Sequence, residues 1–177
     1  MKDQNSTNWS IYFKKTANLL TITRIIFGFI IIVSLEFNLN KIGFIFLLLG
    51  GLSDYFDGWF ARKSGGGSKW GARYDPLADK VLIYAPLIWF CRESFVPMWS
   101  IWFIITRDLV VSNWRASETN GGAANKLGKI KTFLQYSSLL LLIYPSNLNI
   151  LIELGVILYW FSFVISIISG CIYFRNK

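Results

Sequence analysis

Apolar residues form six long runs along the chain, separated by short polar stretches. The runs cover about residues 18–35, 42–62, 76–91, 98–115, 128–144 and 150–174. A helix that spans a bilayer needs roughly 20 mainly apolar residues, so each run is close to the length of one span. The second, third and fourth runs contain charges and are weak by hydropathy alone, so the count also depends on spacing and flanks. The pattern predicts an all-α fold, a polytopic membrane protein with a six-transmembrane-helix bundle.

Composition supports this prediction. Hydrophobic residues make up 54% of the 177 residues, aromatic residues 18%, and the mean hydropathy is +0.45, which is too apolar for a soluble domain of this size. Six spans use the whole length, so we expect a single transmembrane domain, residues 1–177, with a short cytoplasmic N-terminal segment, residues 1–16. Its stretch "NWSIYFKK" is expected either to lie along the membrane interface as an amphipathic anchor or to fray.

Basic residues separate by side of the predicted bundle. The ends and loops of one side hold 13 Lys and Arg residues, whereas the other side holds only Lys41 and Arg92. The positive-inside rule then places both termini in the cytoplasm. The net charge of +8 fits loops that face anionic lipid and phosphorylated substrates, so we expect the lipid bilayer as a partner and no nucleic acid. The absence of histidine excludes a Ser-His-Asp triad and zinc sites built on histidine.

Four aspartates lie in the cytoplasmic parts of the second and third predicted spans. Asp54 and Asp57 are three residues apart, and Asp75 and Asp79 are four apart, so each pair lies on one face of its helix. Both pairs have a similar predicted depth, and we expect them to converge in one layer. Gly58 shares the face of Asp54 and leaves room for a ligand near the backbone.

Such a cluster can be read in more than one way. Small residues on membrane helices usually indicate close helix packing, and "YDP" at Asp75 also resembles an N-cap, which would make this residue a helix cap only. Four converging acids would repel one another unless cations neutralise them, and Mg²⁺ or Mn²⁺ prefers carboxylate oxygens. We therefore expect about two divalent ions suited to phosphoryl transfer. A divalent-metal transporter is the alternative from another class, but the acids are shallow and no repeat is visible. A purely structural scaffold predicts that Asp79→Asn is harmless.

The spacing of these residues resembles the signature of the CDP-alcohol phosphatidyltransferase family, D-x-x-D-G-x-x-A-R followed after eight residues by G-x-x-x-D-x-x-x-D. Every fixed position is filled, by Asp54, Asp57, Gly58, Ala61, Arg62, Gly71, Asp75 and Asp79. The resemblance implies a helical membrane enzyme, commonly a homodimer, that moves a phosphatidyl group from CDP-diacylglycerol to an alcohol and releases CMP.

The same resemblance implies roles for single residues. The four aspartates would bind the metal ions, and Asp79 would also act as the catalytic general base on the acceptor hydroxyl. The cytidine and diphosphate would be held by the small and basic positions of the signature, Gly58, Ala61, Arg62 and Gly71.

Basic residues of the fourth and fifth spans bear on the acceptor. Arg107 and Arg115 lie in the cytoplasmic half of the fourth span, and Lys129 and Lys131 begin the fifth. Each alone is typical of an interfacial anchor, but Arg107 lies deeper and must pair with Asp108 or with the substrate. Together they suit an acceptor that carries a phosphate.

Three segments resemble the phosphatidylglycerophosphate synthase branch of the family. They are "RDLVVSNWR", "LGKIKTFLQ" and the opening "NLLTITR", in which Asn18 and Thr21 would contact the nucleotide. This branch implies glycerol 3-phosphate as the acceptor, in place of inositol phosphate, serine or phosphatidylglycerol. The chain departs from the branch at Ala17 and Gly28, where prolines are usual.

Overall fold

The structure is a computed structural model that describes residues 4–63, 69–117, 126–145 and 148–175. Within these helices, the side chains of several residues lie outside the described part, namely 4–18, 20, 55, 57–63, 69–73, 75, 115–117, 126 and 173–175.

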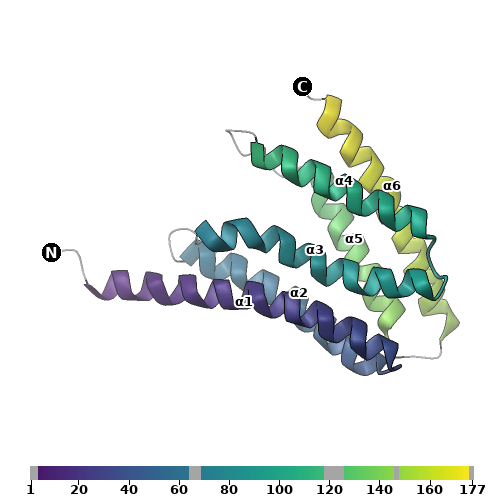
Figure 1. The fold of residues 1–177 in the computed structure, drawn as a ribbon, viewed down its shortest axis with the longest axis horizontal. Coiled ribbons are helices and arrows are strands. Elements are labelled where there is room, and N and C mark those ends of the chain that lie inside the picture. Colours follow the sequence, from purple (N-terminus) through teal and green to yellow (C-terminus); the bar gives the residue numbers. More distant parts are fainter. Residues whose placement is uncertain (1–3, 64–68, 118–125, 146–147, 176–177) are drawn as a thin grey trace. The chain divides into compact units, whose positions relative to one another are not determined.

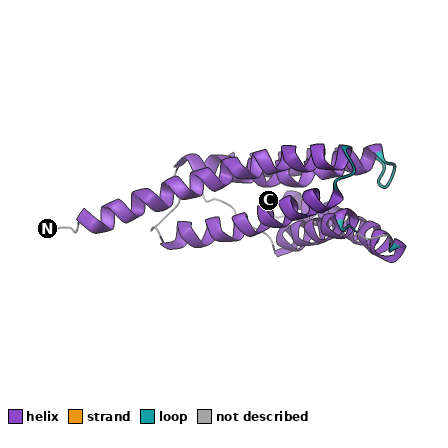
Figure 2. Cartoon of the chain, turned by 90° about the horizontal axis from the view of Figure 1, so that it is seen from below, coloured by secondary structure: helices purple, strands orange, loops and turns teal. Residues whose placement is uncertain are grey.

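The described residues form six α-helices and no strand, which confirms the all-α prediction (Figures 1 and 2). In chain order they are α1 (Gln4–Glu36), α2 (Asn40–Lys63), α3 (Lys69–Arg92), α4 (Met98–Ser117), α5 (Lys126–Ile143) and α6 (Asn149–Arg175). Most ends lie within two residues of the apolar runs. Among the described residues, only Asn149–Ile172 of α6 is long and apolar enough by itself to cross a membrane. The number of spans therefore stays a prediction.

Two helices begin well before their apolar runs. The backbone of α1 is helical from Gln4, so the helix continues through "NWSIYFKK". The backbone of α3 is helical from Lys69, which places Asp75 and Pro76 inside the helix. The interpretation of Asp75 as an N-cap at a helix start is therefore wrong. An apolar run marks where a helix can meet lipid, whereas backbone hydrogen bonds continue into polar sequence.

The chain divides into two compact units, and unit 1 comprises Met1–Ala85. Here α1 and α2 lie side by side as a helical hairpin (Figure 1). Asn38 forms the turn with a φ of 57°, a left-handed conformation that asparagine tolerates well. The amide of Leu39 donates to the carbonyl of Ser34 at 2.8 Å and closes the end of α1.

Glycines allow α3 to approach both helices of this hairpin. A Cβ at Gly28 of α1 would lie 3.1 Å from Cγ1 and 3.3 Å from the carbonyl oxygen of Val81. A Cβ at Gly50 of α2 would lie 2.6 Å from a methyl group of Leu82. The branch that this chain resembles usually has proline at position 28. Glycine at this position allows the close packing of α1 against α3.

Unit 2 comprises Pro86–Lys177, which includes the last turns of α3 and all of α4, α5 and α6. Helix α6 packs against α5 and α4. The hydroxyl of Ser138 on α5 donates to the carbonyl of Gly155 on α6 at 2.7 Å. A Cβ at Gly155 would lie 2.8 Å from Cγ of Leu142, so the glycine sets the close distance between α5 and α6.

Unit 2 buries polar side chains together with apolar ones, and it also exposes many large apolar side chains. Its fully buried side chains include Gln135, Ser162, Ser166 and Ser169, whereas large apolar side chains are exposed, such as those of Trp102, Phe133, Ile150, Phe161 and Val164. The outer face of a helix in a soluble protein is mainly polar instead. Exposed apolar faces of this extent are typical of surfaces that contact lipid or another protein.

Candidate active site

Arg24 of α1 holds together the polar residues of unit 1. Its side chain is fully buried, and its Nη1 donates a hydrogen bond to Oδ1 of Asp54 on α2 at 3.1 Å. The same nitrogen pairs with Oδ1 of Asp79 on α3. Three helices thus contribute one residue each to a single ionic contact. Asp54 and Asp79, two of the four acids that are predicted to converge, thus both contact the guanidinium of Arg24.

The two carboxylates lie where this buried contact meets open surface. The Asp54 side chain is 61% exposed and that of Asp79 is 42% exposed, whereas Arg24 is completely covered. The guanidinium therefore holds both acids from the inside, and a ligand can reach them from the outside.

The residues of this contact fit a divalent cation. Two carboxylates from different helices already converge on one positive charge, and they supply the hard oxygen ligands that Mg²⁺ and Mn²⁺ prefer. Among the described residues there is no group of three or more potential metal ligands. Asp57 and Asp75, which are predicted to complete the set, have side chains outside the described part. The four-acid site thus stays a prediction beyond Asp54 and Asp79.

The predicted nucleotide contacts are only partly described. Thr21 is fully buried and lies one turn before Arg24 on α1, so the two side chains share a face. The other predicted contacts have side chains outside the described part, namely Asn18, Gly58, Ala61, Arg62 and Gly71. Their role stays a prediction.

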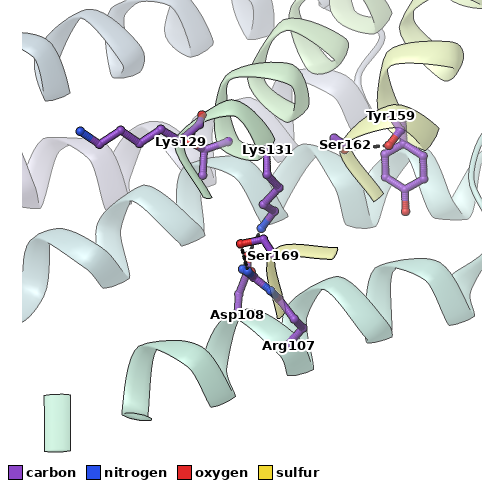
Figure 3. A network of polar contacts seen from close by, with 8 residues as sticks. Arg107, Asp108, Lys129, Lys131, Tyr159, Ser162 and Ser169 are labelled. Atoms are coloured by element: carbon purple, nitrogen blue, oxygen red, sulfur yellow. Dashed lines mark hydrogen bonds and ion pairs between the residues drawn. The ribbon is translucent and has the colours of Figure 1, made fainter. Parts of the chain in front are cut away.

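Unit 2 contains a second charged cluster, formed by Arg107 and Asp108 of α4, Lys131 of α5 and Ser169 of α6 (Figure 3). Arg107 donates from Nη1 to Oδ1 of Asp108 and from Nη2 to Oγ of Ser169, each at 2.8 Å. Lys131, which is only 2% exposed, pairs with Oδ2 of Asp108. Gly170 leaves space for this arrangement, because a Cβ there would lie 3.4 Å from Nε of Arg107.

Of the four residues predicted to bind the acceptor, two belong to this cluster. Arg107 and Lys131 meet at Asp108, which is the pairing expected for Arg107. Lys129 is exposed, and its ammonium points away from the cluster in Figure 3. The side chain of Arg115 lies outside the described part. Two cations and one carboxylate leave one positive charge in excess, so the cluster suits an anion.

Three residues of these two charged contacts are not among the predicted site residues. Arg24 closes the segment "NLLTITR", in which an arginine within an apolar run is itself a signal of a buried partner. Asp108 appears there only as a partner for Arg107, yet it joins two helices. Ser169 gives no sequence signal, because serine is common on membrane helices that pack closely.

Comparison of the sequence with known proteins shows which family the chain belongs to. The model of the family described as CDP-alcohol phosphatidyltransferase matches residues 14–168. A CDP-diacylglycerol--glycerol-3-phosphate 3-phosphatidyltransferase of Rickettsia felis is 33% identical over 171 residues, covering 92% of this chain and 94% of the relative. The protein with the same name from Bacillus subtilis is 34% identical over 141 residues, which cover 76% of this chain and 72% of the relative.

A probable phosphatidylglycerophosphate synthase of Mycobacterium tuberculosis is 31% identical over 137 residues, 73% of this chain and 66% of the relative. The family match includes the Arg24 contact and the Arg107, Asp108 and Lys131 part of the second cluster, and it ends one residue before Ser169. This chain therefore belongs to the CDP-alcohol phosphatidyltransferase family and is an enzyme of that class.

Proposed function

We propose that this enzyme transfers a phosphatidyl group from CDP-diacylglycerol to glycerol 3-phosphate, giving phosphatidylglycerophosphate and CMP. The observation that carries the reaction is the convergence of Asp54 and Asp79, two acids of the complete family signature, on one cationic group. The names of relatives that match nearly the whole chain select glycerol 3-phosphate among the acceptors. Membership of an enzyme family also favours this reaction over a metal transporter.

The proposed reaction breaks the phosphoanhydride bond of CDP-diacylglycerol and forms a new phosphate ester. The free terminal hydroxyl of glycerol 3-phosphate attacks the phosphorus that carries diacylglycerol, and a new oxygen–phosphorus bond forms. The bond from this phosphorus to the CMP oxygen breaks, and CMP leaves with the electron pair. The proton of the attacking hydroxyl passes to a carboxylate oxygen of Asp79, which acts as general base. Its partial exposure is compatible with access to an acceptor.

The acids of the signature would hold divalent ions, Mg²⁺ or Mn²⁺. Asp54 and Asp79 fit this role by their shared approach to a cation, and Asp57 and Asp75 are proposed to complete the set. When bound, such ions supply positive charge for the diphosphate oxygens. Arg24 keeps the two described acids together from the buried side.

The nucleotide part of the donor would be recognised by signature residues around these acids. We assign this role to Asn18 and Thr21 of α1, Gly58, Ala61 and Arg62 of α2, and Gly71 of α3. The small residues leave space beside the helix backbone, and Arg62 supplies a positive charge for the diphosphate.

The acceptor phosphate would bind at the charged cluster of unit 2. Arg107 offers a planar guanidinium and Lys131 a second positive charge, with Asp108 fixing both in place. Arg115 and Lys129 would extend this positive charge at the cytoplasmic side.

We further propose that all six helices span the bilayer, with both termini and the active site on the cytoplasmic side. The weak hydropathy of α4 is compatible with a span, since the charges of Arg107 and Asp108 contact each other and Lys131 of α5 instead of lipid. The exposed apolar residues of both units would face the acyl chains. The two units would act as one domain, residues 1–177, and a homodimer is the expected assembly.

The test is CMP release by the purified protein in detergent with CDP-diacylglycerol and Mg²⁺ or Mn²⁺. Glycerol 3-phosphate, inositol phosphate, serine and phosphatidylglycerol are compared as acceptors. We expect metal-dependent release with glycerol 3-phosphate alone and a loss of about 10²-fold or more in Asp79→Asn. Glu153→Gln, which changes an exposed acid of α6, is the matched control. Release with another acceptor only would overturn the assigned substrate, and full activity of Asp79→Asn would overturn the proposed base.

A further inference from the structure

The contact between α5 and α6 contains buried polar groups whose function the charged cluster does not explain. Gln135 is 1% exposed, and neither its Oε1 nor its Nε2 has a hydrogen-bond partner in the described part of the chain. Ser166 is fully buried, and its Oγ also lacks a partner there. A buried carboxamide without partners is costly by about 1–3 kcal/mol, so these groups require an explanation.

Two contacts fix how the two helices run past each other. At one end, a Cβ at Gly128 of α5 would lie 4.0 Å from Oγ of Ser169 on α6. At the other end, Ser138 of α5 bonds the carbonyl of Gly155 on α6. Gln135 precedes Ser138 by three residues and follows Gly128 by seven, so it lies on the face of α5 that meets α6 in this antiparallel pair.

Helical spacing places the unpartnered groups next to the charged cluster. Gln135 follows Lys131 by four residues on α5, and Ser166 precedes Ser169 by three residues on α6. Residues at these separations are neighbours on one helix face. Both groups therefore lie one turn, about 5.4 Å, from a residue of the cluster that would bind the acceptor phosphate.

Three other serine hydroxyls on the same helix faces have hydrogen-bond partners. Ser138 bonds the Gly155 carbonyl, and Ser162 bonds the carbonyl of Tyr159, each at 2.7 Å. Ser169 accepts a hydrogen bond from Arg107. Helix packing alone thus gives serines local partners, whereas Gln135 and Ser166 hold donors and acceptors available for a ligand.

We propose that Gln135, assisted by Ser166, recognises the hydroxyl groups of the acceptor and determines specificity for its glycerol part. This inference rests on the proposed function, because it assumes that Lys131 and Arg107 bind the acceptor phosphate. A carboxamide both donates and accepts, and a hydroxyl group does the same, so one side chain can make a complementary pair with the middle hydroxyl of glycerol 3-phosphate. Gln135 is then a specificity-determining residue, and the proton transfer belongs to Asp79.

The test compares two acceptors that differ by one hydroxyl group. Glycerol 3-phosphate and 3-hydroxypropyl phosphate both carry the phosphate and the reacting terminal hydroxyl, and only the former has the middle hydroxyl. The full-length enzyme is assayed by CMP release, and kcat/KM is determined for each acceptor with wild type and Gln135→Met, which retains length and helix propensity.

We expect Gln135→Met to lower kcat/KM for glycerol 3-phosphate by about 10- to 100-fold and to change that for 3-hydroxypropyl phosphate by less than about twofold. Ser166→Ala, which removes only a hydroxyl, should act in the same direction with a smaller effect. Ser138→Ala is the matched control, because its hydroxyl already has a partner, and it should affect both acceptors equally.

Thermal unfolding without acceptor separates recognition from a structural role. Removal of an unsatisfied buried carboxamide should leave the unfolding midpoint of Gln135→Met unchanged or raise it. Two results would overturn the inference but not the proposed function. One is a lowered unfolding midpoint of Gln135→Met with an equal loss of kcat/KM for both acceptors. The other is an unchanged ratio of kcat/KM for the two acceptors in both Gln135→Met and Ser166→Ala. Failure of the wild-type enzyme to use glycerol 3-phosphate would overturn both the inference and the proposed function.

Discussion

Replacement of Arg24 by methionine should destabilise unit 1 when divalent ions are absent. The side chain is fully buried and pairs with Asp54 and Asp79, so it joins α1 to both other helices of the unit. Methionine keeps most of the aliphatic stem and helix propensity, and the main change is the loss of the guanidinium.

The size of the effect follows from the two lost hydrogen bonds to charged groups. Each is worth about 1.5–3 kcal/mol when both partners are buried. The acids are 61% and 42% exposed and regain water when Arg24 is removed, so we expect the lower part of this range, about 3–4 kcal/mol in total. A divalent ion that binds the same acids should then restore more stability to the variant than it adds to wild type.

The assay is thermal unfolding in detergent, with a chelator and with Mn²⁺, for wild type, Arg24→Met, Asp79→Asn and the double variant. We expect the chelator-treated Arg24→Met to unfold at the lowest temperature. The double variant should recover part of the loss, because it no longer contains the unpaired Asp79 carboxylate. The reasoning would be refuted if Arg24→Met unfolds at the same temperature as wild type in chelator. It would also be refuted if Mn²⁺ raises the unfolding temperature of both proteins by the same amount.

Three further predictions concern unit 2, each measured as the thermal unfolding midpoint in detergent. Asp108→Asn should cost about 3–5 kcal/mol, because the buried ammonium and guanidinium beside it lose their shared counter-charge; an unchanged midpoint would contradict this. Ser100→Ala should cost about 1–2 kcal/mol, since it removes the 2.5 Å hydrogen bond between this serine and the Tyr159 hydroxyl, and Tyr159→Phe added to it should lessen the loss. Gly155→Ala should cost about 1–3 kcal/mol, because a Cβ there would lie 2.8 Å from a leucine Cγ of α5. Gly128→Ala has space and should be neutral, so equal effects of the two glycine variants would argue against the packing explanation.

The sequence predicts helix positions well where the local signal is hydrophobic. The apolar runs identify all the helices of the described part, and the errors lie at the starts of α1 and α3. The polar and aromatic residues there form helix without forming an apolar run, so hydropathy does not detect them. The register of acids three or four residues apart likewise follows from helix geometry, and Asp54 and Asp79 meet as expected.

Contacts between helices are harder to predict, because they depend on which faces meet. The sequence suggests four acceptor cations, but the structure pairs Arg107 and Lys131 through Asp108 and leaves Lys129 exposed. Gln135 stands in the quoted segment "LGKIKTFLQ", yet only its burial without partners indicates a function. A glutamine in sequence carries no sign of whether its amide is satisfied.

Under the proposed six-span topology, the charge pairing between α4 and α5 has a consequence for the biosynthesis of the protein. A translocon releases each segment into lipid or retains it according to its apparent free energy of insertion. A lone Arg, Lys or Asp at the centre of a helix makes this free energy less favourable by about 2.5–3.5 kcal/mol. Arg107 and Asp108 emerge together, but Lys131 follows 23 residues later and is paired only when α5 has arrived. The strongly apolar α6 comes last. We therefore expect α4 and α5 to remain beside the translocon until α6 is made, so that the C-terminal three helices leave it as one group.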